Sequence, residues 1–258
     1  MSNSPQTSSQ SPQGSQVVTT HIKDLHLFGY WRSSSTWRVR IALAAKDLPF
    51  EYHSIDILHG ESKKADYANN VNSMKQIPVL ECIVSDTAQG KQIRITQSLA
   101  IIEFIEEAFA GVGESLLPKN LVDRAKVREI AEIVNSGIQP LQNLSVMSMI
   151  DEFGKGLVET QLGNGQRFGK YHIENGLRAI ESSVLKIREE QIDPDRFAIG
   201  SSSPTLADAF IVPQMYNARR FFVDLENVCP TLLKIESHCL QHIWFMSSHP
   251  DVVKSRYP

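Results

Sequence analysis

The most constraining feature of this sequence is an unbroken run of four hydroxyl residues at positions 33–36. Before it, Leu25 and Leu27 alternate with their neighbours, as in a strand with one buried face. After it, Trp37, Ile41 and Ala45 recur at a spacing of four, which is typical of a helix. The pattern therefore predicts a strand, a turn and a helix whose first residues carry hydroxyl side chains.

Two interpretations of this hydroxyl run stay open on residue types alone. Serine is a preferred N-cap, because its oxygen accepts a hydrogen bond from an unpaired N–H of the first helical turn. One cap needs one hydroxyl, so a second is free to point outward from the helix N-terminus, whose partial positive charge favours an anion such as a thiolate. The alternative is a plain cap with solvent-facing serines, which the commonness of serine caps favours.

Composition excludes several classes of protein. The chain has 258 residues, 41% apolar and 21% charged, with a net charge of −3, so it is long enough for one large globular domain or two ordinary ones. It has no long basic patch, so nucleic acid is not an expected partner, and no apolar run of bilayer length, so no membrane association is expected. Three cysteines without a CxxC pair predict a reducing, cytoplasmic environment, with no disulfide framework and no metal centre.

Residues 1–20 are rich in Ser, Gln, Thr and Pro and contain no charged side chain, so they predict a disordered tail rather than a targeting peptide. A second strand is expected over 50–56 and a polar loop over 59–64. Pro78 stands at the entrance of an apolar strand, and a cis bond after Ile77 would expose the Ile77 backbone to a ligand. Residues 79–84 and 92–95 are expected to pair as a hairpin around a turn at 85–91.

A second polar helix start follows at Gln97 and Ser98, ahead of an amphipathic helix reaching Phe109. The N-termini of two helices, at residues 33–36 and at Ser98, could therefore face the same anion. Glycines and a proline mark residues 110–120 as a linker, and the remainder has helical periodicity, clearest over 173–187. Thr205 and Asp208 have capping-box spacing, which favours a folding role for Asp208 over catalysis. A last helix is expected over 231–247.

The predicted organisation is an α/β domain over 21–109 and an all-helical domain over 121–258. Within it, the motif SSSTWRVRIAL at 33–43 resembles the signature of zeta-class glutathione transferases, namely Ser-Ser-Cys, one further residue, and Trp-Arg-Val-Arg-Ile-Ala-Leu. Further motifs similar to the family are MKQIP at 74–78, QSLAIIE at 97–103, GIQPLQNLS at 137–145, VPQ at 212–214 and NARRF at 217–221. The resemblance spans about residues 25–250 and implies a thioredoxin-like N-terminal domain followed by the helical domain of a glutathione transferase.

The sequence departs from the family at two positions. Ser73 stands where the family usually has proline, which alters only local stiffness. Ser35 stands where it usually has cysteine, and a hydroxyl is far less acidic and less nucleophilic than a thiol. Ser35 therefore bears on isomerase activity more than on glutathione binding.

The resemblance implies that Ser33, assisted by Ser34 and Ser35, holds the glutathione sulfur as a thiolate. The residues implied to bind glutathione are Ser33, Ser34, Ser35, Thr36, Trp37, Arg38, Lys63, Ile77, Gln97, Ser98, Gln139, Asn143, Leu144 and Ser145. Gln139, Asn143 and Ser145 are expected on the first long helix of the second domain. Arg38 and Arg220 are implied to bind substrate carboxylates, and a surface ion pair with Asp224 or Glu226 is the alternative for Arg220.

The implied activity is the glutathione-dependent cis–trans isomerisation of maleylacetoacetate, a small dicarboxylic enone, to fumarylacetoacetate in phenylalanine and tyrosine catabolism. The implied assembly is a homodimer. Two alternatives stay open: glutathione-dependent displacement of halide from small α-halo acids, and a non-catalytic glutathione-binding scaffold, which Ser35 favours. His238 and His242 share a helical face, but they lack a partnering ligand and predict ordinary core or surface histidines.

Overall fold

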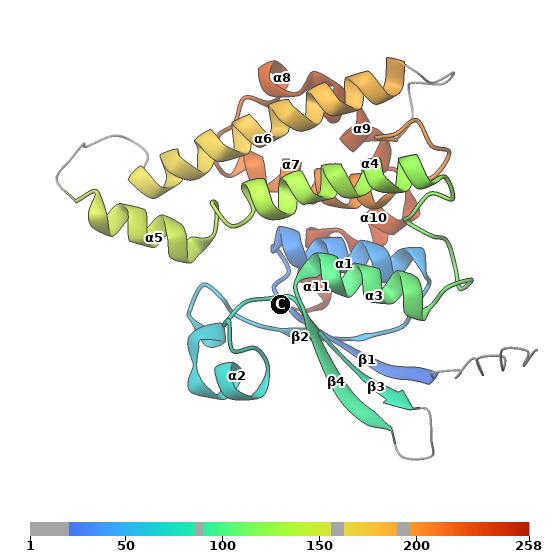
Figure 1. Cartoon of the computed structure of the whole chain (residues 1–258). Helices are drawn as coiled ribbons and strands as arrows, with labels where there is room; N and C mark the ends of the chain where they lie inside the picture. Colours follow the sequence, from blue (N-terminus) through green and yellow to red (C-terminus); the bar gives the residue numbers. More distant parts are fainter. Residues whose placement is uncertain (1–20, 86–89, 156–162, 190–196, 258) are drawn as a thin grey trace, which may run out of the picture.

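The computed structural model describes residues 21–85, 90–155, 163–189 and 197–257 (Figure 1). The expected tail at 1–20 and the tip of the turn expected at 85–91 lie outside these ranges. None of the helices in the described ranges is long and apolar enough to cross a bilayer.

Four strands form one mixed sheet in the order β2-β1-β3-β4. They are β1 (His21–Gly29), β2 (Glu51–Ser54), β3 (Val79–Ser85) and β4 (Lys91–Thr96). Strand β1 pairs parallel with β2 and antiparallel with β3, and β3 and β4 form the expected antiparallel hairpin. Leu25 and Leu27 are buried on one face, and helices α1 (Ser34–Ala45) and α3 (Ser98–Ala108) cover that face side by side (Figure 1). The strand, turn and helix predicted around the hydroxyl run are confirmed.

One element of this half is missing from the sequence-based description. Where only a polar loop is expected, the chain forms a 3₁₀ turn at Glu61–Lys63 and the short helix α2 (Ala65–Asn70). Tyr67 is the buried residue of α2, and its hydroxyl donates to the carbonyl oxygen of Gln76 at 2.9 Å. A six-residue helix held by one side chain shows no apolar period, so periodicity does not reveal it.

The second half is helical, as expected. Its elements are α4 (Leu121–Glu132), which continues into a π-helical segment (Ile133–Ile138), then α5 (Leu144–Phe153), α6 (Asn164–Glu189), α7 (Leu206–Arg219), α8 (Leu225–Val228), α9 (Pro230–Cys239), α10 (Ile243–Ser248) and α11 (Pro250–Arg256). Helix α6 carries the apolar stripe expected over 173–187, and Ile173, Leu177, Ile180 and Val184 are fully buried. No helix or strand occupies residues 110–120, and the domain division there stays a prediction.

The single helix expected over 231–247 is wrong. The chain breaks after α9 and restarts as α10 and α11, with His242 and His249 as their N-caps. The backbone N–H groups of Trp244 and Asp251 donate to the Nδ1 atoms of these histidines at 3.5 and 3.3 Å. Apolar spacing continues across the break, so periodicity gives no sign of it.

The folding role of Asp208 is confirmed. Its carboxylate accepts hydrogen bonds from the N–H groups of Thr205 at 2.7 Å and Ala198 at 2.9 Å, and it is fully buried beneath the start of α7. Burial raises the pKa of Asp208. The capping box thus fixes the first turn of α7, the helix that contacts α1 of the other half.

Candidate active site

A cavity of about 500 Å³ lies between the two halves, next to the N-termini of α1 and α3. Its walls come from the turn after β1, the region of α2, the segment before β3 and residues 135–147 of the helical half. The expected site residues that line it are Ser33, Ser34, Ser35, Lys63, Ile77, Gln97, Ser98, Gln139, Asn143, Leu144, Ser145 and Arg220. Residues far apart in the sequence are therefore brought to one place.

Ser33 is the N-cap of α1, and its oxygen accepts the N–H of Thr36 at 3.2 Å. The same oxygen lies 3.1 Å from Oγ of Ser35. A hydroxyl that accepts a hydrogen bond still has its own proton to donate. The two interpretations of this serine are therefore compatible, because it can cap the helix and donate to an anion in the cavity.

The next two serines connect α1 to the opposite walls. Ser34 Oγ donates to Oε1 of Gln139 at 3.2 Å, and Ser35 Oγ donates to the carbonyl oxygen of Ile77 at 3.4 Å. The Ile77–Pro78 bond is cis, as expected. The hydroxyl run is thus held between the helical half and the segment that enters β3.

No cysteine is among the described residues that line the cavity. Cys82, Cys229 and Cys239 are buried as free thiols. Burial raises the pKa of Cys82 to about 11 and that of Cys229 to about 12, so neither ionises near neutral pH. A reactive thiol at this cavity must come from a ligand.

Thr36, Trp37 and Arg38, which the resemblance implies bind glutathione, are not among the residues that line the cavity. Helix α1 is covered by the sheet on one side and by α7 and α10 on the other, so these side chains are buried. Trp37 donates its indole N–H to Oγ of Ser248 at 3.0 Å. The Thr36 side chain lies against Gly29, where an added Cβ would come within 2.2 Å of its methyl group.

Arg38 lies beneath the cavity rather than in it. Its guanidinium donates to Oε1 of Gln139 at 2.7 Å and to Oγ of Ser98 at 3.4 Å, and it stacks over the ring of Phe210. Burial lowers the pKa of Arg38 to about 9, which still leaves it charged at neutral pH. Arg38 therefore positions two lining side chains and adds positive potential from below.

Arg220 lines the cavity and donates to Oδ1 of Asn217 at 3.1 Å, so the alternative ion pair with Asp224 or Glu226 is not what it forms. Arg219, its neighbour, pairs with Glu236 at 2.5 Å. A second guanidinium in the cavity belongs to Arg32, which the sequence analysis did not select. Burial and the nearby charge of Arg32 together lower the pKa of Arg220. The position of Arg32 directly before Ser33, in the same turn, is the sequence signal that pointed to it.

The structure also corrects the place of the residues expected on one long helix. Gln139 follows the π-helical segment, Asn143 is the N-cap of α5, and Ser145 lies in the first turn of α5. Pro140 favours a turn between the two helices, because it has no backbone N–H and its ring clashes with the preceding helical turn. Gln142 was not among the expected site residues. Its side-chain amide exchanges two hydrogen bonds with that of Gln214, at 2.9 and 3.0 Å, and these bonds stabilise the turn.

The electrostatics of the cavity are one-sided. Its described lining contains four cationic side chains, Arg32, Lys63, Lys75 and Arg220, and no Asp or Glu. The positive ends of α1 and α3 add to this charge. In a chain with a net charge of −3, such a lining is suited to a ligand with several negative charges.

Comparison with known proteins places the chain in a family. Residues 23–107 match the family described as glutathione S-transferase, N-terminal domain. A probable maleylacetoacetate isomerase of Caenorhabditis elegans is 36% identical over 225 residues, which cover 87% of this chain and 92% of that protein. The chain belongs to the zeta-class glutathione transferases, the family of maleylacetoacetate isomerases.

Two solved structures of this family bear on the cavity. Maleylacetoacetate isomerase from Anaeromyxobacter dehalogenans 2CP-1, with glutathione bound in its active site, is 40% identical with a TM-score of 0.73, covering 90% of this chain and 96% of that one. The same enzyme with bound dicarboxyethyl glutathione and citrate is 39% identical with a TM-score of 0.72, at the same coverage.

Proposed function

We propose that the chain is a glutathione-dependent isomerase that converts maleylacetoacetate, a cis enone with two carboxylates, to fumarylacetoacetate in the catabolism of phenylalanine and tyrosine. The observation that carries the proposal is the cavity itself, in which a hydroxyl-capped helix end faces two guanidinium groups and no acidic side chain. The related enzyme that binds a dicarboxyethyl derivative of glutathione supports both parts of this ligand assignment.

The lining residues fit glutathione. The tripeptide has carboxylates at both ends, and the N-terminus of α3 at Ser98, with Gln97 beside it, suits the γ-glutamyl carboxylate. The backbone of Ile77, a lining residue, suits the cysteinyl part, and Lys63 suits the glycyl carboxylate. The guanidinium of buried Arg38 donates to the neutral side chains of Ser98 and Gln139, so its positive charge adds to the potential at the cavity.

Glutathione, when bound, supplies the thiolate that adds to the double bond, allows rotation about it and leaves unchanged. Ser33 holds its proton toward the sulfur, and the positive end of α1 favours the ionised form. Arg32 and Arg220 hold the substrate carboxylates and stabilise negative charge that develops during the reaction. A general base is not required, which is consistent with a lining without His, Asp or Glu among its described residues.

The test is a stopped assay of the purified chain with maleylacetoacetate, with and without glutathione. We expect conversion only with glutathione. Ser33→Ala should lower kcat about 100-fold or more, as for the loss of one donor to a reacting anion, while glutathione affinity changes much less. Ser255→Ala, an exposed serine of α11, is the control and should match the unchanged chain.

Unchanged turnover of Ser33→Ala would overturn the role of Ser33. Glutathione binding without conversion would favour the scaffold alternative, and halide release from an α-halo acid would favour displacement chemistry. Ser35→Cys then separates the remaining possibilities, because it restores the residue usual in the family and should restore conversion if Ser35 limits it.

We also propose that the enzyme works as a cytoplasmic homodimer. The resemblance to the family supports this assembly, and exposed apolar side chains at the start of α4, Leu121 and Val122, offer surface for a subunit contact. Sedimentation equilibrium of the full chain tests it: a single species of twice the chain mass is expected, and a monomer at micromolar concentration contradicts it.

A further inference from the structure

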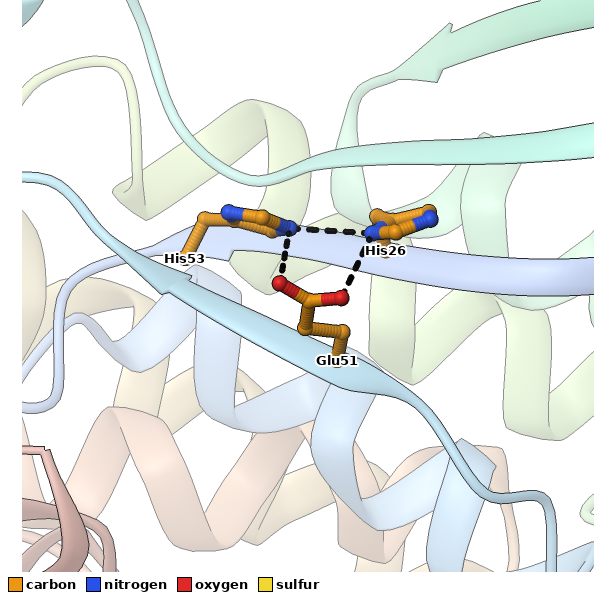
Figure 2. Close-up of side chains that lie close together, drawn as sticks. All are labelled: His26, Glu51 and His53. Carbon is orange, nitrogen blue, oxygen red and sulfur yellow. Dashed lines mark hydrogen bonds and ion pairs between the residues drawn. The ribbon is translucent and has the colours of Figure 1, made fainter.

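A second group of chemically active side chains lies on the sheet, away from the cavity lining. His26 of β1 and Glu51 and His53 of β2 point toward one another on the open face of the sheet (Figure 2). Nδ1 of His26 and Nε2 of His53 are 3.0 Å apart. The Glu51 carboxylate reaches both rings, with Oε2 at 3.5 Å from His26 and Oε1 at 3.4 Å from His53.

The backbone imposes this arrangement. In the parallel pair β1–β2, His26 is in register with Glu51, and Phe28 is in register with His53. Alternation along each strand sends these side chains to one face, while Leu27 and Tyr52 between them are buried on the other. The ring of Phe28 stacks on His53 at 4.6 Å and an interplanar angle of 15°, which holds that imidazole in place.

The short separation of the two imidazole nitrogens is informative. At 3.0 Å the N–H of one neutral ring can donate to the lone pair of the other, and the same separation also allows both lone pairs to coordinate one metal ion. Ligand atoms about 2.1 Å from one metal ion are separated by about 3.0–3.4 Å at angles between 90° and tetrahedral. The N–N separation of 3.0 Å lies in this range, and the separations of 3.5 and 3.4 Å, which join His26 and His53 to the two different oxygens of Glu51, lie close to its upper end. One ligand atom from each of the three residues lies within 4.8 Å of the other two.

We propose that His26, Glu51 and His53 form a binding site for a divalent transition-metal ion, with Zn²⁺ as the ion that the donors suit best. Two imidazoles and a carboxylate are typical zinc ligands, whereas Ca²⁺ and Mg²⁺ prefer all-oxygen sites. Side-chain exposures of 30%, 65% and 33% leave the ion open to solvent, so water completes its coordination.

The neighbouring charges restrict the site to these three ligands. Glu81 lies in register with His26 on its other side, but its carboxylate is engaged by Arg94 at 2.5 Å. The ion therefore joins β1 to β2, which is the edge strand of the sheet. The bound ion would hold the edge strand β2 to β1, and this role is independent of the isomerase reaction. The sequence gives no hint of it, because the ligands come from two strands and meet only through their register.

The experiment is isothermal titration of the untagged full chain with Zn²⁺ at pH 7.5. One ion per chain is expected, with an increase in the thermal unfolding temperature. His53→Gln and Glu51→Gln should each weaken binding at least tenfold. His59→Gln is the matched control: His59 contacts Asp56 at 2.5 Å as another exposed histidine–carboxylate pair, but no second imidazole is placed with it.

Absence of binding at 100 μM Zn²⁺, or equal binding by the chain and Glu51→Gln, would overturn the proposal. Glu51 is largely exposed, so its replacement leaves the fold intact even if His53→Gln does not. Co²⁺ provides an independent readout, since bound Co²⁺ acquires visible absorption bands that the variants should lack.

Discussion

Gln97 holds a backbone conformation that costs free energy at the point where β4 ends and α3 begins. Its φ of 72° and ψ of 119° lie outside the regions that residues with a Cβ readily adopt. Residues held in this way cost about 1–3 kcal/mol each and concentrate at ligand sites. Gln97 lines the cavity, so we infer that the strain is kept because it directs this side chain toward glutathione.

Replacing Gln97 by glycine should therefore make the fold more stable while it weakens glutathione binding. We expect the free energy of unfolding to rise by about 1 kcal/mol, since relief of strain exceeds the entropic cost of glycine. The KM for glutathione should rise about tenfold or more through loss of a hydrogen bond to a charged group. Urea unfolding and steady-state kinetics measure the two effects.

Asp47→Gly is the matched control, because Asp47 also has a positive φ, 51°, but is exposed beyond the end of α1 and does not line the cavity. It should change stability slightly and leave KM unaltered. Equal KM values for the chain and Gln97→Gly would contradict the assignment of Gln97 to glutathione.

The site residues differ in how far the sequence reveals them. The serines at 33–35 stand at a helix start, which is a local pattern, but residue types alone favoured a plain cap, and the resemblance to the family assigned them to the site. The side chain of Arg38 could not be placed, because whether a residue of α1 faces the cavity or α7 depends on packing from both halves. Arg32 and Gln142 were missed for the same reason, since they reach the cavity only through the turns that carry them.

At the scale of elements, the C-terminal segment is divided by its caps. A histidine caps a helix only while its ring nitrogen can accept, and protonation removes that lone pair. Burial lowers the pKa of His249, with the Arg40 charge adding to the effect and Asp251 opposing it. Burial lowers the pKa of His242 as well, and nearby His238 lowers it further. The apolar period predicted a helix in this region, but its ends depended on these individual side chains.

The caps predict how stability depends on pH. Both histidines have pKa values below 6.5 in the folded chain, so the unfolded chain binds more protons as the pH falls through 6.5. Their contribution is therefore complete above pH 6.5 and is lost on acidification. His249→Asn keeps an N-cap acceptor but does not titrate, so it should reduce the loss of stability between pH 7 and pH 5 by up to about 1 kcal/mol.

Urea titrations at several pH values measure this difference, with His59→Asn as a control whose histidine lies at the surface and caps no helix. A pH dependence of His249→Asn identical to that of the unchanged chain would show that the His249 cap does not contribute.

At the scale of the whole molecule, the last helices return to the first helix of the chain. Ser248 at the end of α10 accepts the indole N–H of Trp37 on its side-chain oxygen at 3.0 Å. Its carbonyl oxygen accepts Nε of Arg40 at 3.1 Å, and all three side chains are buried. Tyr257 packs near Tyr52 of β2, with ring centroids 5.0 Å apart. The two halves thus share a polar contact inside the core.

Ser248→Ala should consequently destabilise the chain more than the loss of one hydroxyl at a surface. It leaves the indole N–H of Trp37 buried without an acceptor, which costs about 1–3 kcal/mol. Ser247→Ala is the control, since that neighbouring serine is exposed and its replacement should change stability by less than about 0.5 kcal/mol. Urea unfolding followed by tryptophan fluorescence and by circular dichroism measures both.

If Ser248 joins the halves, the fluorescence and circular dichroism transitions of the unchanged chain have the same urea midpoint, and Ser248→Ala lowers both midpoints together. Equal midpoints for the two alanine variants would show that the Trp37–Ser248 contact does not hold the halves together.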